Sequence, residues 1–430
     1  MKVLITPVGS AGDNFPYIGL GTELVRRGHD VTVFTSEPFI DFARRCGLAS
    51  VQLGSTDEYR ETTADPDVFH PRRGFAAVMK YVREYQQRLR AALGEHFVPG
   101  ETIVVAHALD FVSRCLHEAR GWPIVTVHLA PIVLRTLHRT PVMSGTTDLS
   151  FLPRWAKRIL WHVADRWMID PHAAPIVNEL RAEFALPPVR SVFKDWIHSP
   201  LRTIGLFPDW YGPPQPDWPP QLRLTGFPLF DAPPGVAAPD AVESFLGAGE
   251  PPIVFTPGSA NRHARAFFAA AAGACRRLGR RGLLLTSHGE DVPRPLPDGV
   301  THADFAPLSR ILERCAAIVH HGGIGTTAAG LAAGVPQLVM PLSHDQPDNA
   351  ARVLRLGAGE RLMPKRFTER NVGEKLAALL ASERVRARCR ELALRCRQRS
   401  GLSDACDLIE AAAHGTCAPP RVKRNSPILG

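Results

Sequence analysis

Short apolar runs alternate with helix-like segments along this chain, and the alternation is interrupted only near its middle. In the first half, segments with helical periodicity separate apolar runs at residues 2–7, 30–36, 102–107 and 123–128. Short apolar runs followed by helical segments that end at glycine are typical of parallel strands connected by helices. We therefore expect an α/β fold, in which helices cover both faces of a doubly wound parallel sheet.

A proline-rich segment separates two such units. Twelve prolines occur from residue 208 to residue 252, a density that neither a helix nor a central strand tolerates. The strand–helix alternation then resumes, so we expect two Rossmann-like domains whose strands point their carboxyl ends into a shared cleft. The expected regions are an N-terminal domain at 1–207, an interdomain connection with one short strand at 208–250, a C-terminal domain at 251–414 and a loose tail at 415–430.

Composition and charge exclude several classes of protein. The chain has 45% hydrophobic and 22% charged residues, as a soluble globular protein does. No window approaches the ~20 apolar residues of a membrane span, and the N-terminus does not resemble a secretory signal. The eight cysteines lack C-x-x-C spacing, which argues against zinc and disulfides and for a reducing cytoplasm. The net charge of +9 suits an anionic substrate or membrane surface, with a solvated basic surface as the alternative, and no nucleic-acid motif occurs.

A glycine-rich turn follows an apolar run in the second half. The run ends at His320 and His321, residues 322–325 form the turn, and Thr326 and Thr327 open a helix. Backbone N–H groups at a helix start bind anions, and glycines let phosphate oxygens approach the backbone. The pattern indicates a diphosphate site, and a capped structural turn is the alternative. No Gly-Lys-Ser/Thr sequence of a Walker A loop occurs, which argues against phosphoryl transfer.

A polar cluster, SHDQPDN (343–349), follows the next apolar run. Its position predicts that Asp345 and Gln346 lie beside the glycine-rich turn, where they could bind sugar hydroxyls. The alternative is that His344 and Asp345 only cap the helix that begins at Pro347.

Together these elements resemble the donor-binding signature of family 1 nucleotide-sugar glycosyltransferases, which have the GT-B fold. Residues 305–312 also resemble the family segment whose leading aromatic stacks on the nucleobase, although many plant members have tryptophan at that position. The resemblance implies a C-terminal donor domain and the following roles: diphosphate binding by His321, Gly323, Gly325, Thr326, Thr327 and Ser259, sugar binding by Asp345 and Gln346, and nucleobase binding by Phe305 and Leu308.

The first apolar run is followed by Gly12-Asp13-Asn14-Phe15-Pro16, whereas a dinucleotide-binding turn would read G-x-G-x-x-G. Plant members of the family carry Gly-His-x-x-Pro with a catalytic histidine, and many bacterial members carry Gly-Asp-x-x-Pro. The resemblance implies that Asp13 is the general base, and partial burial would raise its pKa from about 4. The alternative is an N-cap for a helix that begins near Pro16. Phe15 and His107 are candidate acceptor-binding residues, and a purely structural histidine is the alternative for the latter.

Narrower segments, among them PDWYGPPQPDWP and TGFPLFD, resemble the rhamnosyltransferases of rhamnolipid biosynthesis. That resemblance implies dTDP-L-rhamnose as co-substrate, no resident cofactor, and a 3-(3-hydroxyalkanoyloxy)alkanoate as acceptor. With such an acceptor, a cytoplasmic enzyme could also make a peripheral contact with the inner membrane or with an acyltransferase partner. Three alternatives stay open: another dTDP- or UDP-sugar on a sterol or polyketide, a nucleotide-sugar 2-epimerase, and a non-catalytic nucleotide-sugar-binding subunit.

The resemblance further implies an inverting reaction without a metal, since a helix dipole and hydrogen-bond donors take the metal's place. Asp65-Pro66-Asp67 matches the D-x-D pattern of metal-dependent glycosyltransferases. It stands in a polar stretch that follows no strand, so we interpret it as a turn.

Residues 151–170 predict an amphipathic helix with an aromatic and aliphatic side between basic flanks. Two interpretations fit: the helix lies in a membrane interface, or it packs its apolar side on its own domain, which we favour. The apolar side consists of Trp155, Ile159, Trp161, Val163 and Trp167, and the flanks of Arg154, Lys157, Arg158 and Arg166.

Overall fold

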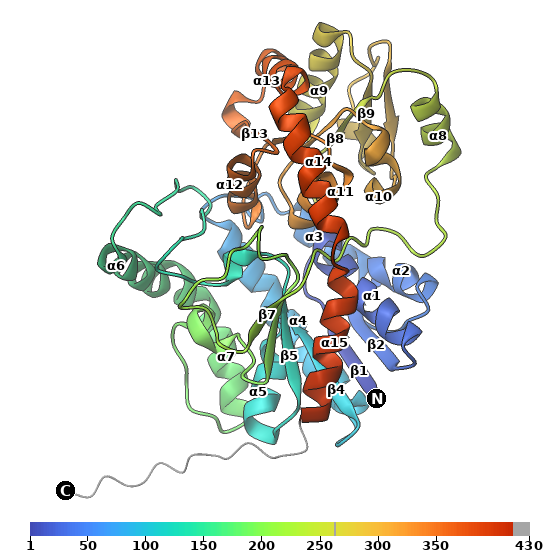
Figure 1. The fold of residues 1–430 in the computed structure, drawn as a ribbon. Coiled ribbons are helices and arrows are strands. Elements are labelled where there is room, and N and C mark those ends of the chain that lie inside the picture. Colours follow the sequence, from blue (N-terminus) through green and yellow to red (C-terminus); the bar gives the residue numbers. More distant parts are fainter. Residues whose placement is uncertain (262–263, 416–430) are drawn as a thin grey trace, which may run out of the picture.

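The computed structural model describes residues 1–261 and 264–415, which form two α/β units (Figure 1). The first unit contains a parallel sheet of seven strands in the order β3-β2-β1-β4-β5-β6-β7. Its central strands are buried on both faces, which explains their continuously apolar sequence. The strands are β1 (Lys2–Thr6), β2 (Asp30–Ser36), β3 (Ala49–Gly54), β4 (Thr102–His107), β5 (Ile124–His128), β6 (Arg202–Gly205) and β7 (Leu222–Leu224).

Helices cover both faces of this sheet, as the alternation predicts. One face packs against α1, with Leu20 and Leu24 in the core, and the other against α4 and α5, with Leu89 and Phe111 in the core. A π-helical segment (Asp165–Ile169) joins α6 to α7, so that the three segments form one continuous helical stretch. The helices are α1 (Ala11–Arg26), α2 (Ile40–Arg45), α3 (Thr56–Ala64), α4 (Gly74–His96), α5 (Phe111–Arg120), α6 (Arg154–Ala164) and α7 (Asp170–Glu183).

The second unit contains a parallel sheet of six strands in the order β10-β9-β8-β11-β12-β13. The strands are β8 (Ile253–Thr256), β9 (Gly282–Leu285), β10 (Val300–Ala303), β11 (Ala317–His320), β12 (Gln337–Val339) and β13 (Gly359–Arg361). The helices are α8 (Asp240–Gly247), α9 (Arg265–Leu278), α10 (Leu308–Ile311), α11 (Ile324–Ala333), α12 (Gln346–Leu356), α13 (Glu369–Ala381), α14 (Glu383–Arg397) and α15 (Gly401–His414). Both sheets have the doubly wound α/β architecture that the sequence predicts.

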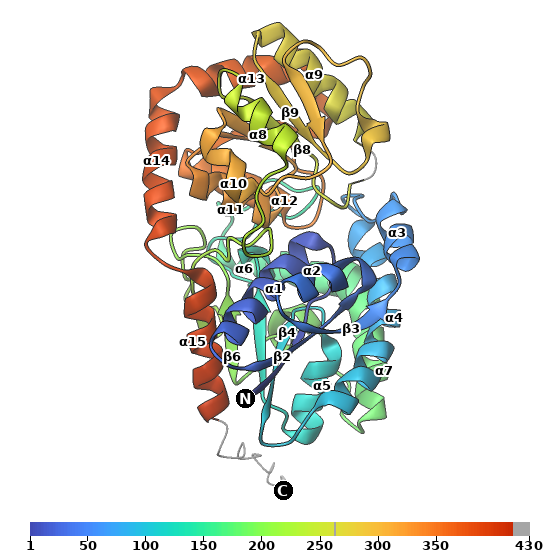
Figure 2. The ribbon, with the colours of Figure 1, turned by 90° about the vertical axis from the view of Figure 1, so that its right-hand side faces the viewer.

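The chain crosses between the units twice. At both crossings, the residues that belong to each unit differ from the domain division expected from the sequence. β7, inside the expected connection, is the edge strand of the first sheet. α14 packs on α11, but α15 returns to the first unit, where it contacts α1 and β6 (Figure 2). The periodicity of the sequence indicates that α15 is amphipathic. It does not indicate which of the two cores the apolar side of α15 joins. The expected tail lies, apart from Gly415, outside the described residues.

The helix that spans residues 154–169 does not pack its apolar side on its own domain, which was the favoured interpretation. Trp161 is partly covered and its ring donates a hydrogen bond to the Thr136 carbonyl, but Trp155 and Trp167 are 67% and 72% exposed. Most of the apolar side is therefore not packed on the N-terminal unit. None of the helices in the described part of the chain has the length and apolar character that a membrane crossing requires.

Candidate active site

A cavity of about 1410 Å³ is lined by residues of both units, at the carboxyl ends of the two sheets. It brings together nearly all the residues that the sequence singles out, although they come from both halves of the chain. Thr327 is the exception: it is fully buried inside α11, its hydroxyl has no partner, and it does not line the cavity. The lining includes Asp13, Phe15, His107, Ser259, Phe305, Leu308, His321, Gly323, Gly325, Thr326, Asp345 and Gln346.

Asp13 lies in the first turn of α1. The helix begins at Ala11 rather than near Pro16, so Asp13 is not the N-cap; it is the third helical residue, and Ser10 is the N-cap. The Asp13 carboxylate accepts hydrogen bonds from the Ser10 backbone N–H (2.8 Å) and hydroxyl (3.1 Å). Burial raises the pKa of Asp13 to about 6, although both hydrogen bonds lower it. The site thus holds a carboxylate that can exchange a proton near neutral pH.

Gly9 makes room for this carboxylate. A Cβ atom at Gly9 would lie 2.2 Å from Asp13 Oδ2, and the backbone there has φ +135°. Both features favour glycine, because a side chain would displace the carboxylate and strain the backbone.

Asp345 lies on the opposite wall, at the N-cap of α12. Burial, and after it the negative charge of Asp13, raise the pKa of Asp345 to about 7. The two carboxylates, 332 positions apart, are therefore close enough to repel each other across the cavity. Asn349 Nδ2 donates a hydrogen bond to Asp345 Oδ2 at 2.7 Å.

His321 is held between two glycine turns. A Cβ atom at Gly258 would lie 2.7 Å from its ring, and one at Gly323 would lie 2.5 Å from Nε2. Burial lowers the pKa of His321 to about 4, so the ring is neutral at physiological pH. The structure therefore presents a fixed, uncharged imidazole beside the start of α11.

The turn itself leads into α11 two residues earlier than the sequence predicts, at Ile324. Gly323 is the N-cap, so the free N–H groups of the first helical turn belong to residues that line the cavity. His320, the neighbour of the site histidine, points elsewhere: Nε2 contacts Gln337 Oε1 at 2.9 Å. Strand alternation separates these two histidines, since successive side chains point to opposite faces.

Gln346 both lines the cavity and holds the loop before it. Its side-chain oxygen accepts hydrogen bonds from the N–H groups of Leu342 (2.8 Å) and Ser343 (3.2 Å). The amide nitrogen is then the group of Gln346 that could meet a ligand. His344, in the left-handed region at φ +57°, contacts the Val68 carbonyl of the first unit at 2.8 Å through Nε2.

Asn349 is a residue that the sequence reasoning missed. Its side chain donates to Gly322 O (2.9 Å) as well as to Asp345, and it accepts a hydrogen bond from Tyr211 Oη at 2.7 Å. It thus connects the glycine-rich turn, the Asp345 carboxylate and the interdomain connection. The spacing of four residues from Asp345 to Asn349 at the start of one helix was the sequence signal that could have predicted their contact.

The N-terminal end of the cavity is largely apolar. Phe15 lines it while stacking on Phe42, with ring centroids 4.2 Å apart. His107 accepts a hydrogen bond from the Leu109 N–H, and burial lowers its pKa to about 4. Apolar side chains of the first unit extend this surface, among them Val78, Val133, Leu160, Trp161, Val163 and Trp167.

The D-x-D segment forms a turn. The Asp67 N–H donates to Asp65 Oδ1 at 2.9 Å, which is the local bond of an Asx turn. Within residues 1–261 and 264–415, no group of three or more histidine, cysteine, aspartate or glutamate side chains could hold a metal ion.

Comparison with known proteins places the chain in a family. The family model of the erythromycin biosynthesis protein CIII-like C-terminal domain matches residues 283–399, and that of the glycosyltransferase family 28 N-terminal domain matches residues 3–138. O-mycaminosyltylonolide 6-deoxyallosyltransferase from Streptomyces fradiae is 32% identical over 442 aligned positions, which cover 95% of this chain and 97% of the relative. This chain belongs to the EryCIII-like glycosyltransferase family. It is therefore an enzyme that transfers a sugar, as the donor signature predicts.

Solved structures confirm the GT-B fold of this glycosyltransferase. The kitacinnamycin glycosyltransferase superposes with a TM-score of 0.72 at 22% identity and covers 96% of this chain and 99% of its own. The spinosyn rhamnosyltransferase SpnG, solved with thymidine diphosphate, gives a TM-score of 0.67 at 17% identity and covers 95% and 100%. These matches do not support the narrower resemblance to the enzymes of rhamnolipid biosynthesis.

Proposed function

We propose that this glycosyltransferase moves a sugar from a dTDP-sugar to a hydroxyl of a polyketide-type acceptor, with inversion at the anomeric carbon. The names of the Streptomyces relative and of the erythromycin-type family model support an acceptor of this class over a lipid. The thymidine diphosphate bound to SpnG supports the nucleotide. A cytoplasmic location, predicted from the cysteines, fits a nucleotide-sugar co-substrate.

The donor end would hold the diphosphate at the start of α11. Free N–H groups, the positive end of the helix dipole and the Thr326 hydroxyl face the place where charge develops as the sugar leaves. The neutral His321 ring, fixed by two glycines, adds a donor there. In the same proposal Ser259 meets the diphosphate, Asp345 and Gln346 meet the sugar, and Phe305 and Leu308 meet the base.

At the acceptor end, Asp13 takes the proton of the acceptor hydroxyl as that oxygen attacks the anomeric carbon. The bond from this carbon to the diphosphate oxygen breaks, and its electron pair leaves with the diphosphate. Attack from the side opposite the leaving group inverts the centre. Phe15, His107 and the apolar wall would surround a bulky acceptor.

One observation carries this proposal: Asp13 and the glycine-rich turn at residues 322–326 line the same cavity, although they come from different units. A 2-epimerase acts on the donor alone and would need neither the carboxylate of Asp13 nor an apolar wall. A non-catalytic subunit would need no base.

Asp13→Asn tests the base. We expect turnover to fall about 10²- to 10⁴-fold while the affinity for dTDP is kept, because general-base catalysis contributes about that factor. Asp304→Asn, a carboxylate at the exposed rim of the same cavity, is the matched control and should keep its activity. Full turnover in Asp13→Asn would refute the assignment, and donor isomerisation without acceptor would favour the epimerase.

The substrate class needs a separate measurement. Mass spectrometry would follow dTDP-rhamnose, dTDP-glucose, UDP-glucose and UDP-N-acetylglucosamine, each with a macrolactone, a sterol and a 3-(3-hydroxyalkanoyloxy)alkanoate. We expect products from dTDP-sugars on the macrolactone. Product from dTDP-rhamnose on the hydroxyalkanoate alone would restore the lipid acceptor.

A further inference from the structure

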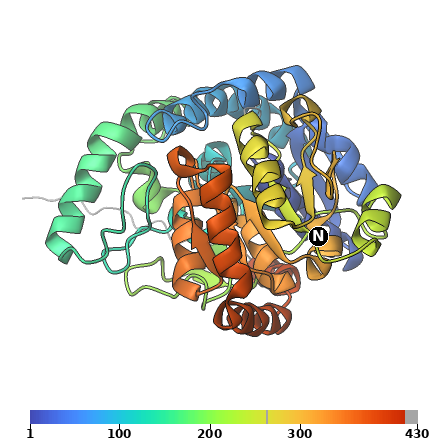
Figure 3. The same cartoon turned by 90° about the horizontal axis from the view of Figure 1, so that it is seen from above.

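More than half of the large exposed apolar side chains of the described residues lie on one helix or just before it. Among the described residues, thirteen large apolar side chains are exposed, and seven of them lie between residues 151 and 168. Single exposed apolar residues are ordinary, whereas a contiguous group marks a surface that meets something. The seven are Phe151, Trp155, Ile159, Leu160, Val163, Trp167 and Met168. Viewed from above, this helix forms the outer edge of the molecule, in teal to green (Figure 3).

Two rows of side chains run side by side along this helix. An apolar row recurs every four residues, and a basic row recurs with the same spacing one residue earlier. Spacing of four aligns side chains along a helix surface, and adjacent residues differ by about 100° in direction. Arginines therefore border the apolar row at three of its four positions. The apolar row is Trp155, Ile159, Val163 and Trp167; the basic row is Arg154, Arg158, His162 and Arg166.

Acidic side chains of this segment are turned inward. Asp165 is buried in an ion pair with Arg135, and Asp170 accepts hydrogen bonds from the N–H groups of Ser191 and Val192. The exposed polar side chains from residue 154 to residue 168 are consequently basic. An anionic partner complements this surface, and a cationic one does not.

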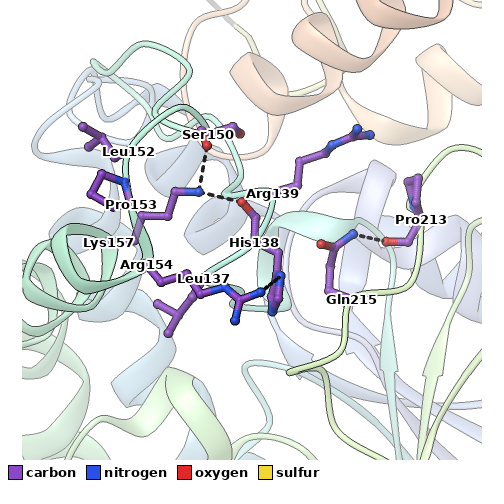
Figure 4. A pocket seen from close by; sticks show the side chains of 10 residues that line it. All are labelled: Leu137, His138, Arg139, Ser150, Leu152, Pro153, Arg154, Lys157, Pro213 and Gln215. Atoms are coloured by element: carbon purple, nitrogen blue, oxygen red, sulfur yellow. Dashed lines mark hydrogen bonds between the residues drawn. The ribbon is translucent and has the colours of Figure 1, made fainter.

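A surface hollow with basic lining residues lies at the start of the same helix. A hollow of about 630 Å³ is lined by His138, Arg139, Arg154 and Lys157, and no carboxylate lines it. The buried Lys157 ammonium donates to the carbonyl oxygens of His138 (2.6 Å) and Ser150 (2.8 Å), and Arg154 donates to His138 Nδ1 at 3.3 Å (Figure 4). The N-terminus of α6 adds the positive end of its dipole. The hollow thus suits a phosphate group.

We propose that α6 and the adjoining turn to residue 168 seat this enzyme on a bilayer that contains anionic phospholipid. The apolar row enters the boundary between headgroups and acyl chains, and the basic row and the hollow meet lipid phosphates. A second copy of the chain fits less well, because a symmetric contact through this face would bring two arginine rows together.

The same face continues into the cavity. Leu160, Val163 and Trp167 are exposed and also line the cavity that Asp13 lines. A bilayer on this face would therefore adjoin the entrance for a hydrophobic acceptor. The docking itself does not depend on the proposed acceptor or on the assignment of the base.

Co-sedimentation of the full chain with vesicles tests the proposal. We expect binding to equimolar phosphatidylglycerol and phosphatidylcholine, and at least tenfold weaker binding to phosphatidylcholine alone. Trp155→Gln combined with Ile159→Gln should weaken binding about tenfold or more, and Arg158→Gln combined with Arg166→Gln should remove the preference for anionic vesicles. None of these four residues lines the cavity, so sugar transfer in solution should stay unchanged and report a folded protein.

Matched controls separate this surface from the general positive charge of the chain. Leu394→Gln replaces an apolar residue that is 62% exposed, and Arg276→Gln with Arg370→Gln removes two exposed charges of the other unit. Equal loss in the controls, or no binding of the parent protein to either vesicle, would overturn the proposal. Light scattering completes the test: a dimer that Trp155→Gln with Ile159→Gln dissociates, without vesicle binding, would make a second copy the occupant.

Discussion

Asp13 combines a structural and a proposed chemical task in one carboxylate. Oδ2 accepts both hydrogen bonds from Ser10, which fixes the side chain at the start of α1. These bonds stabilise the ionised form, whereas burial destabilises it, and burial is the larger effect on its pKa. The outcome is a positioned carboxylate whose pKa of about 6 suits the proposed proton transfer near neutral pH.

A pH profile of kcat/KM should report this group. Since only the ionised carboxylate accepts a proton, we expect activity to rise with pH through about 6 and to level off above about 7. Ser10→Ala removes one bond that lowers the pKa of Asp13, so the midpoint should move to higher pH. Profiles of both proteins would be measured with saturating donor. A profile that is flat from pH 5 to 8, or a midpoint that moves down, would contradict the role of Asp13.

At the scale of elements, two chain crossings touch where the units join. A Cβ atom at Gly401, the first residue of α15, would lie 2.3 Å from the Gly226 carbonyl oxygen and 2.4 Å from that of Phe227. Both obstacles are backbone atoms, which cannot rotate away as a side chain can. The return of α15 to the first unit therefore depends on glycine at this position.

Gly401→Ala should lower the free energy of unfolding by about 2–4 kcal/mol, because the backbone must move to relieve the clash. Denaturant unfolding measures this change. Gly94→Ala is the matched control, since nothing lies within 4 Å of a Cβ there and the position is inside α4. That control should be neutral or stabilise by about 0.5–1 kcal/mol. A Gly401→Ala protein as stable as the parent would show that the crossings separate easily.

Element boundaries explain which parts of the site's local structure could be predicted from the sequence. β11 and the glycines after it are local signals, so the turn after this strand and the position of His321 in it could be predicted, whereas its diphosphate-binding role stays a proposal. The exact start of α11 could not be predicted, and the sequence reasoning placed Thr327 in the site although its side chain is buried and does not line the cavity. Two of the three partners of Asn349, Gly322 and Tyr211, are distant in sequence and could not be predicted, and only the spacing to Asp345 was a local signal.

At the scale of the whole molecule, the cavity exists only because two sheets present their carboxyl ends to each other. A ligand that binds there stabilises the folded state by mass action. We expect dTDP at 100 times its Kd to stabilise the protein by about 2.7 kcal/mol, seen as a rise in Tm. UDP at the same concentration should raise Tm less if the base site is specific for thymine.

Variants separate this effect from general stabilisation by anions. His321→Ala should lose most of the rise in Tm with dTDP, whereas Asp13→Asn should keep it. Of these two residues, His321 is the one assigned to the donor. Inorganic diphosphate serves as the anion control. An equal rise in Tm for the parent and His321→Ala would exclude the glycine-rich turn as the donor site.

The local structures follow from the order of residues along the chain: apolar runs buried on both faces as β1, β4 and β5, helices that end at glycine, and the turn that carries His321. Each depends on neighbours along the chain, whose periodicity reports burial and turn geometry. Three features depend on how distant segments pack: the interaction of Asp13 with Asp345, the return of α15 to the first unit, and the exposure of Trp155. An amphipathic pattern shows that a face is apolar and cannot show what covers it, because that depends on where distant segments come to lie.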